Sequence, residues 1–160
     1  VRAALYGLPL MMAIIGGQPD RFAGHVELYH RALKQFGHAR LPVGMHALGL
    51  IADSDEEAAE TWWRSWEPMV AMMAKERGFY APTEERYRQE LDTGALFVGS
   101  AETVARKIAR MVRILHIDRF DLKYDLIGLD RAARTRTIEL LGTTVAPRVR
   151  ELLEAEGNHE

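Results

Sequence analysis

The sequence predicts an α/β fold in which parallel strands alternate with helices. Residues 7–17, GLPLMMAIIGG, form an almost unbroken apolar run that ends in two glycines and leads directly into a helix start. Such a run is typical of a strand buried on both faces of a parallel sheet. Two more apolar runs, over residues 41–52 and 117–126, are also followed by helical patterns. This alternation favours a parallel sheet with right-handed crossovers.

The position of the first run indicates a larger domain. A strand buried on both faces needs a neighbouring strand on each side and a helix on each face. Only six residues precede residues 7–17, and the chain opens with Val1. We therefore expect the sequence to be the later part of a larger α/β domain.

The first 37 residues are expected to form a helix end, a strand and a helix. Val1–Tyr6 has the pattern of a helix end that Gly7 terminates, and Leu8–Ile15 is the strand. Pro19 suits the first position of the next helix, which extends to about Phe36. Apolar residues three or four positions apart define the buried face of that helix: Phe22, Val26, Tyr29, Leu33 and Phe36.

The middle of the chain combines a strand with a long helix. The strand lies within Leu41–Ala52, and Ser54 and Glu57 form a capping box that opens the helix. Pro68 is expected to kink or end this helix. Its buried face is predicted to be Ala58, Trp62, Trp66, Met69 and Met73. A short helix is expected around Thr83–Leu91.

The last third contains a short apolar run, Leu96–Val98, a helix capped by Ser100, and a strand over Ile117–Leu126. A final helix begins at Asp130, and Pro147 interrupts its pattern. The inner faces of the two helices are predicted to be Val104, Ile108, Met111 and Leu115, then Ile138, Leu141 and Val145. We therefore expect one domain over residues 1–153 and a frayed tail over residues 154–160.

Composition narrows the function classes. The 160 residues contain no cysteine, so disulfides and thiolate metal sites are excluded. His25, His30 and His38 lack the spacing of a helical zinc pair, and no metal is assigned. The net charge of −2 and the lack of a basic block argue against a nucleic-acid partner. No apolar stretch approaches the roughly 20 residues of a membrane span, and we expect a cytoplasmic protein.

The element order is compatible with the last third to half of an eight-stranded α/β barrel, which takes about 250 residues. A free-standing three-stranded α/β sandwich is the alternative.

Four sequence blocks, in this order, carry a more specific resemblance: YGLPLMMAIIGGQPDRFAGHVELYHRA, LPVGMHALGLIADSDEEAAE, GALFVGSAETVARKI and DRFDLKYD with IELLGTTVAPRVREL. Together they resemble the C-terminal half of the luciferase-like monooxygenase family, the flavin-dependent and in some branches deazaflavin-dependent oxidoreductases.

This resemblance implies a (β/α)8 TIM barrel in which Leu8–Ile15, Val43–Ile51 and Arg119–Asp125 are the sixth, seventh and eighth strands. Residues 54–95 would be a helical insertion after the second of these three strands, Val43–Ile51. The cofactor implied is FMN or deazaflavin F420. The family's phosphate-binding loop would lie before Val1, so we expect this chain alone to lack a complete flavin site, and no catalytic residue is assigned.

Ligands of a barrel lie at the carboxyl ends of its strands, and this rule selects the candidate site residues. Ile15, Gly16 and Gly17 either allow a flavin ring or substrate to approach the backbone closely or simply make a tight turn. His46 is either a hydrogen-bond donor to flavin or substrate or a core histidine.

A charged alternation follows in the last strand. Asp121, Lys123 and Asp125 alternate with apolar residues, which places the three charges on one face. In a barrel that face points into the lumen, and Lys123 and Asp125 become site candidates. In a free-standing fragment the face is solvated. The tryptophans and methionines of residues 62–73 form either a helix core or an apolar lid over the substrate.

Two functions therefore remain open. The chain is part of a flavin-dependent oxidoreductase or monooxygenase that oxidises a small organic substrate with reduced flavin and O2. The alternative is a non-catalytic, truncated barrel module that self-associates and lacks a complete flavin site. Because an uncovered strand edge is a template for pairing, we expect a homo-oligomer.

Overall fold

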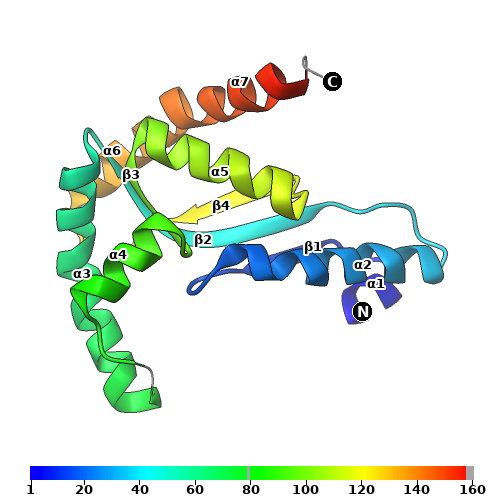
Figure 1. Cartoon of the computed structure of the whole chain (residues 1–160), viewed down its shortest axis with the longest axis horizontal. Coiled ribbons are helices and arrows are strands. Elements are labelled where there is room, and N and C mark those ends of the chain that lie inside the picture. Colours follow the sequence, from blue (N-terminus) through cyan, green and yellow to red (C-terminus); the bar gives the residue numbers. More distant parts are fainter. Residues whose placement is uncertain (79, 158–160) are drawn as a thin grey trace.

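The computed structural model describes residues 1–78 and 80–157, and its elements alternate as the sequence predicts (Figure 1). The strands are β1 (Leu10–Ala13), β2 (Val43–Ala52), β3 (Leu96–Ser100) and β4 (Arg119–Lys123). The helices of the first half are α1 (Arg2–Leu5), the 3-10 turn η1 (Pro19–Phe22), α2 (Ala23–Gln35) and α3 (Asp55–Arg77). Those of the second half are α4 (Glu84–Asp92), α5 (Ala101–Leu115), α6 (Arg131–Leu140), the π-helical turn η2 (Leu141–Val145) and α7 (Ala146–Gly157).

The long strand β2 organises a four-stranded parallel sheet. Its first half pairs with β1, from Leu10 opposite Val43, and with β4. Its second half pairs with β3, from Leu48 opposite Leu96 to Ala52 opposite Ser100. The parallel sheet with helical crossovers confirms the α/β class. The described strands do not close on themselves, so a complete barrel stays a prediction.

Thr137 replaces a neighbouring strand along one edge of β2. Backbone groups of successive residues in a strand point to opposite edges. The carbonyl of His46 accepts from the N–H of Ile14, the residue after β1, whereas that of Val43 accepts from the N–H of Asp118, the residue before β4. Ile51 has the same parity as Val43, and both its N–H and its carbonyl bond to the hydroxyl of Thr137 in α6. The opposite edge of β2 is therefore taken by β1 and then by β3.

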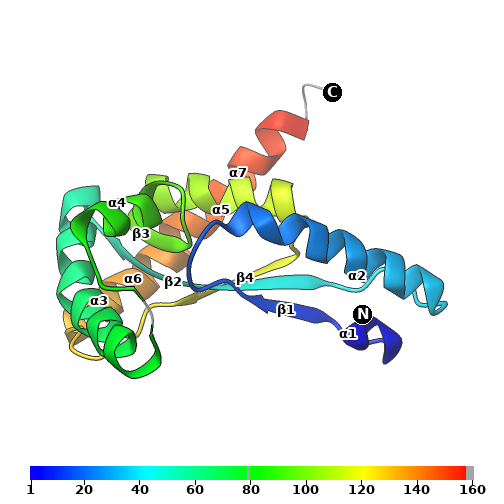
Figure 2. The same cartoon turned by 60° about the horizontal axis from the view of Figure 1, so that its bottom comes forward.

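Helices α2 and α5 cover one face of the sheet (Figure 2). The sheet contributes Met12, Ile14, Met45 and Phe97, which are all buried. From α2 come Val26, Tyr29 and Leu33, and from α5 come Val104, Ile108, Met111 and Leu115. The predicted α5 face is therefore confirmed, whereas the predicted α2 face is confirmed except at Phe36, which is 36% exposed, and Phe22, which is only partly buried. We call this side of the sheet the helix face.

The other side, the open face, is covered only at the carboxyl end of β2, where α3 and α4 lie (Figures 1 and 2). Ala58, Trp62 and Trp66 of α3 pack there against Leu48, Leu50, Leu96 and Val98. Rings of Trp66 and Tyr87 lie 5.1 Å apart between their centroids, and the Tyr87 hydroxyl donates to the carbonyl of Ala59 at 2.7 Å. Further down the open face, Met11 is 46% exposed.

Some local predictions differ from the structure. β1 and β4 are shorter than the apolar runs that predicted them, and Leu96–Val98 belongs to a full strand of the sheet. The helix α3 does not end at Pro68, whose position on that helix is exposed. Ile138 is 52% exposed, and Thr137 and Leu140 are buried in its place.

The end of the chain also departs from expectation. The π-helical turn η2 precedes Pro147, which lies in the first turn of α7 and does not end the helix. One extra residue per turn shifts the helical register, and the predicted inner face was extrapolated without that shift. Helix α7 continues past Leu153 to Gly157, and residues 158–160 of the expected frayed tail lie outside the described residues.

None of the described helices is both long and apolar enough to cross a membrane.

Candidate functional site

A pocket of about 720 Å3 opens on the open face, at the carboxyl ends of β1 and β4 and under α3. The sheet register explains its floor. Ala13 of β1 lies opposite His46 of β2, and Leu96 of β3 and Lys123 of β4 both lie opposite Leu48. Because residues opposite one another in a sheet share a face, these five side chains line one surface.

Helix α3 supplies the apolar wall of the pocket. Trp66, Met69, Val70 and Met73 lie along one side of this helix and line the cavity. Trp66 is only 5% exposed, so it belongs to the core and to the wall together. The sequence left open whether the tryptophans and methionines of residues 62–73 form a core or an apolar ligand surface. The structure places Trp62 in the core, Trp66 in both the core and the pocket wall, and Met73 in the wall.

The glycines after β1 lie at the rim. Gly17 has a φ of +73°, which L side chains rarely adopt. A β-carbon built at Gly16 or Gly17 would have no heavy atom within 4 Å. The backbone of this turn therefore borders open space, and both glycines line the pocket.

The carboxylate of Glu90 in α4 connects this rim to the residue before β3 by two hydrogen bonds, which we call the Glu90 clasp. One carboxylate oxygen accepts the N–H of Gly17 at 3.0 Å, and the other accepts the N–H of Ala95 at 3.0 Å. Gly94 is required beside this clasp, because a β-carbon there would collide with the Glu90 side chain. The position of the glycine turn thus depends on a residue 73 positions away.

Lys107 of α5 holds the carboxyl end of α4 in place. Its ammonium group donates to the carbonyls of Leu91 and Leu96, both at 2.7 Å, and more weakly to that of Glu90 at 3.3 Å. A cation at a helix C-terminus is favourable because the helix dipole is negative there. Burial lowers the pKa of Lys107 to about 8, and the charge of Glu90 opposes that shift.

Five of the six candidate residues come together. Ile15, Gly16, Gly17, His46 and Lys123 all line the pocket. Asp125 does not, because β4 ends at Lys123 and the chain leaves the sheet before it. The Asp125 carboxylate instead accepts from Arg134 of α6 at 3.1 Å. The predicted alternation therefore extends only to Lys123, and Asp121 bonds Arg119 at 2.8 Å.

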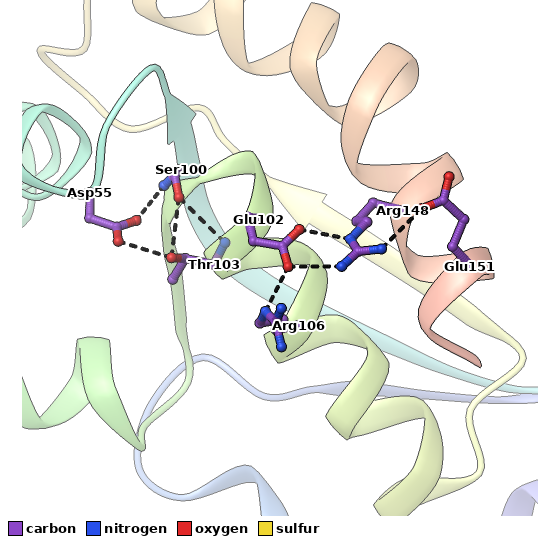
Figure 3. A network of polar contacts seen from close by, with 7 residues as sticks. All are labelled: Asp55, Ser100, Glu102, Thr103, Arg106, Arg148 and Glu151. Carbon is purple, nitrogen blue, oxygen red and sulfur yellow. Dashed lines mark hydrogen bonds and ion pairs between the residues drawn. The ribbon is translucent and has the colours of Figure 1, made fainter. Parts of the chain in front are cut away.

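A second polar cluster surrounds the N-terminus of α5 (Figure 3). The Asp55 carboxylate accepts from the N–H of Ser100 at 2.6 Å and from the hydroxyl of Thr103 at 2.9 Å. Burial alone would raise the pKa of Asp55, but these hydrogen bonds hold it below its usual value. This helix N-terminus is already occupied by a carboxylate of the chain itself, so the cluster ties α3 to α5.

In the same first turn of α5, Glu102 accepts from Arg148 of α7 through both oxygens, at 2.8 and 3.1 Å (Figure 3). Hydrogen bonds from Arg148 lower the pKa of Glu102. This pair joins α5 to α7 and is structural. Within residues 1–78 and 80–157, no group of three acidic or histidine side chains is placed to hold a metal ion.

Sequence reasoning missed Glu90 and Lys107. Each lies in a segment that was correctly predicted to be helical, but neither has a local signal of its role. Glu90 bonds a glycine 73 residues away and Lys107 bonds a carbonyl 17 residues away. The roles of these two residues become visible only in the tertiary structure, which brings their distant partners beside them.

Comparisons with known proteins find solved structures of similar fold, but no family model or curated protein of similar sequence. No family model matches the sequence, and no curated protein is similar to it. Among solved structures, the chain resembles the oxygenating constituent of 3,6-diketocamphane monooxygenase from Pseudomonas putida, in complex with FMN. The TM-score is 0.71 at 20% identity, over 92% of this chain and 44% of the other.

Two further structures share the fold. A monooxygenase from Streptomyces bottropensis has a TM-score of 0.75 at 17% identity, over 91% of this chain and 43% of the other. The coenzyme F420-dependent tetrahydromethanopterin reductase from Methanopyrus kandleri has a TM-score of 0.58 at 17% identity, over 87% and 45%. The structural neighbours thus agree with the family suggested by the four sequence blocks. The chain spans less than half the length of each of these three.

Proposed function

We propose that this chain is part of a flavin-dependent oxidoreductase of the luciferase-like type. The observation that carries the proposal is the pocket at the carboxyl ends of β1 and β4, in a chain whose fold matches monooxygenases. Five residues selected from the sequence alone line that pocket. In the whole protein, we propose, the sheet continues into a closed barrel, with residues 54–95 as a helical insertion at its mouth.

The pocket residues fit the ring of a flavin better than its phosphate. The turn at Gly16 and Gly17 borders open space, and the apolar wall of α3 excludes water. Lys123 is the one cation among the lining residues that the structure describes, and the N-terminus of α5, a typical anion site, is occupied by Asp55. We propose that FMN or F420 places its ring here and that barrel residues outside this chain hold its phosphate.

When bound, FMN would supply electron transfer and the reaction with O2, whereas F420 would supply hydride transfer. The residues of this chain position and shield. Glu90 fixes the Gly17 backbone, Trp66 and its neighbours exclude water, and His46 holds a proton or donates a hydrogen bond from the pocket floor. The alternative of a self-associating, non-catalytic module draws on the exposed open face but does not explain the pocket.

A flavin titration with matched variants tests this proposal. FMN and riboflavin are added to the chain while the flavin fluorescence is followed, and both are expected to bind alike because the phosphate is held elsewhere. Gly16→Leu fills the open space at the rim and should abolish quenching. Gly24→Leu places the same side chain on exposed space of α2 and should leave quenching unchanged. Equal quenching by both variants would refute the proposed ring site.

A further inference from the structure

The two charged side chains that line the pocket differ in whether they are hydrogen-bonded within the described part of the chain. Glu90 and Lys123 are the lining side chains that carry a charge at neutral pH. Both carboxylate oxygens of Glu90 accept backbone N–H groups, so that charge is held in the clasp. The ammonium group of Lys123 has no hydrogen bond or ion pair with any residue in the described part of the chain.

The neighbours of Lys123 on the sheet do not neutralise it. Asp121, two positions earlier on the same face, is bonded to Arg119 at 2.8 Å. Leu48 lies opposite Lys123, and His46 is the next residue on that face of β2. His46 also lines the pocket, and its imidazole can donate a hydrogen bond to a ligand there. The floor therefore offers one cation and one further donor, and the acidic residue opposite His46, Asp121, is engaged by Arg119.

Apart from Tyr80, the remaining side chains that line the cavity are apolar. Leu48, Leu96 and Leu126 are buried around the floor, and Trp66 lies above. A charged contact becomes stronger when water is excluded from it. A ligand with an apolar body would bury that body against these side chains while its charged end reached Lys123.

We propose that the pocket takes an organic substrate with an apolar ring body and a carboxylate, which Lys123 binds with help from His46. This inference rests on the proposed function, since it takes the occupant to be the molecule that the flavin oxidises. It specifies the substrate class, which the fold leaves open.

Calorimetric titration of the chain with two aromatic probes of the same shape tests the inference. Naphthoate carries the carboxylate, and naphthamide is its neutral counterpart. Naphthoate should bind about ten-fold more tightly, because a hydrogen bond to a charged group contributes more than a neutral one. In Lys123→Gln this preference should disappear, with naphthamide affinity unchanged. Lys34→Gln removes an exposed lysine of α2 outside the pocket and should retain the preference.

Three results would overturn the inference: no binding of either probe, equal affinities in the wild type, or a preference that survives Lys123→Gln with the circular dichroism unchanged. A fourth concerns the source of the anion. If FMN displaces naphthoate and riboflavin does not, Lys123 binds the flavin phosphate and not a substrate. Failure of the flavin proposal looks different, because the naphthoate preference then persists while Gly16→Leu has no effect on flavin quenching.

Discussion

Replacement of Thr137 by valine should reveal how β2 is stabilised at Ile51, where Thr137 takes the place of a neighbouring strand. The hydroxyl of Thr137 accepts from the N–H of Ile51 and donates to its carbonyl, both at 3.1 Å. Thr137 is 0% exposed and Ile51 is 1% exposed, so water cannot replace the hydroxyl. Valine has nearly the same shape as threonine, and Thr137→Val therefore removes two hydrogen bonds with little change in packing.

The expected loss follows from what remains unpaired. A buried polar group left without a partner costs about 1–3 kcal/mol, and Thr137→Val leaves the N–H and the carbonyl of Ile51 in that state. Because a carbonyl tolerates the loss better than an N–H, we expect a total of about 2–3 kcal/mol. Thr137→Ser keeps the hydroxyl and loses one methyl group, which costs about 1 kcal/mol.

Urea unfolding of the three proteins measures these free energies. Thr137→Val should lower the midpoint more than Thr137→Ser, with the same dependence on denaturant. Thermal unfolding should show a fall in Tm of roughly 5–10 °C for Thr137→Val, from about 2–4 °C per kcal/mol at this size. If Thr137→Val were as stable as the wild type, or more stable than Thr137→Ser, the edge of β2 would not depend on this hydroxyl.

Two further predictions concern Lys107 and Met11. The folded-state pKa of Lys107, about 8, lies below the usual value near 10.4, so between these pH values only the unfolded chain keeps the proton. The free energy of unfolding should therefore rise with pH relative to Lys107→Met, by roughly 2 kcal/mol from about pH 8 to about pH 10; urea unfolding at both pH values checks this, and a flat difference would contradict it. Met11 is 46% exposed on the open face, and Met11→Lys should reduce the mass measured by light scattering to that of one chain, whereas Met72→Lys on α3 (49% exposed) should not. A wild-type chain that is already monomeric would contradict the homo-oligomer prediction.

Much of the local structure could be predicted from the sequence. The predicted caps Ser54 and Ser100 each accept from the backbone N–H three residues later, and Thr83, at the start of the expected short helix, does the same. Such signals act within one turn, so the residue types alone determine them. Ile138 shows the limit, because the π-helical turn after it changes the period on which its predicted burial rested.

The candidate site could be predicted in part. Ligands of a barrel lie at the carboxyl ends of its strands, and the two-residue period of a strand places His46 and Lys123 on the face that a ligand would meet. Asp125 followed the same alternation, but the chain leaves the sheet after Lys123 and turns Asp125 toward Arg134. Where a strand ends depends on its neighbours, which a single apolar run does not specify.

By itself the sequence determined the alternation of strands and helices, the main buried faces and the resemblance to a flavin-dependent family, since these follow from periodicity and from short motifs in order. Only the tertiary structure decided what forms the pocket. The register of β1, β3 and β4 on β2 brings His46, Leu48, Leu96 and Lys123 to one floor. The clasp of Glu90 on Gly17 joins residues 73 positions apart. Contacts of that length arise from packing across the whole chain, and no local pattern encodes them.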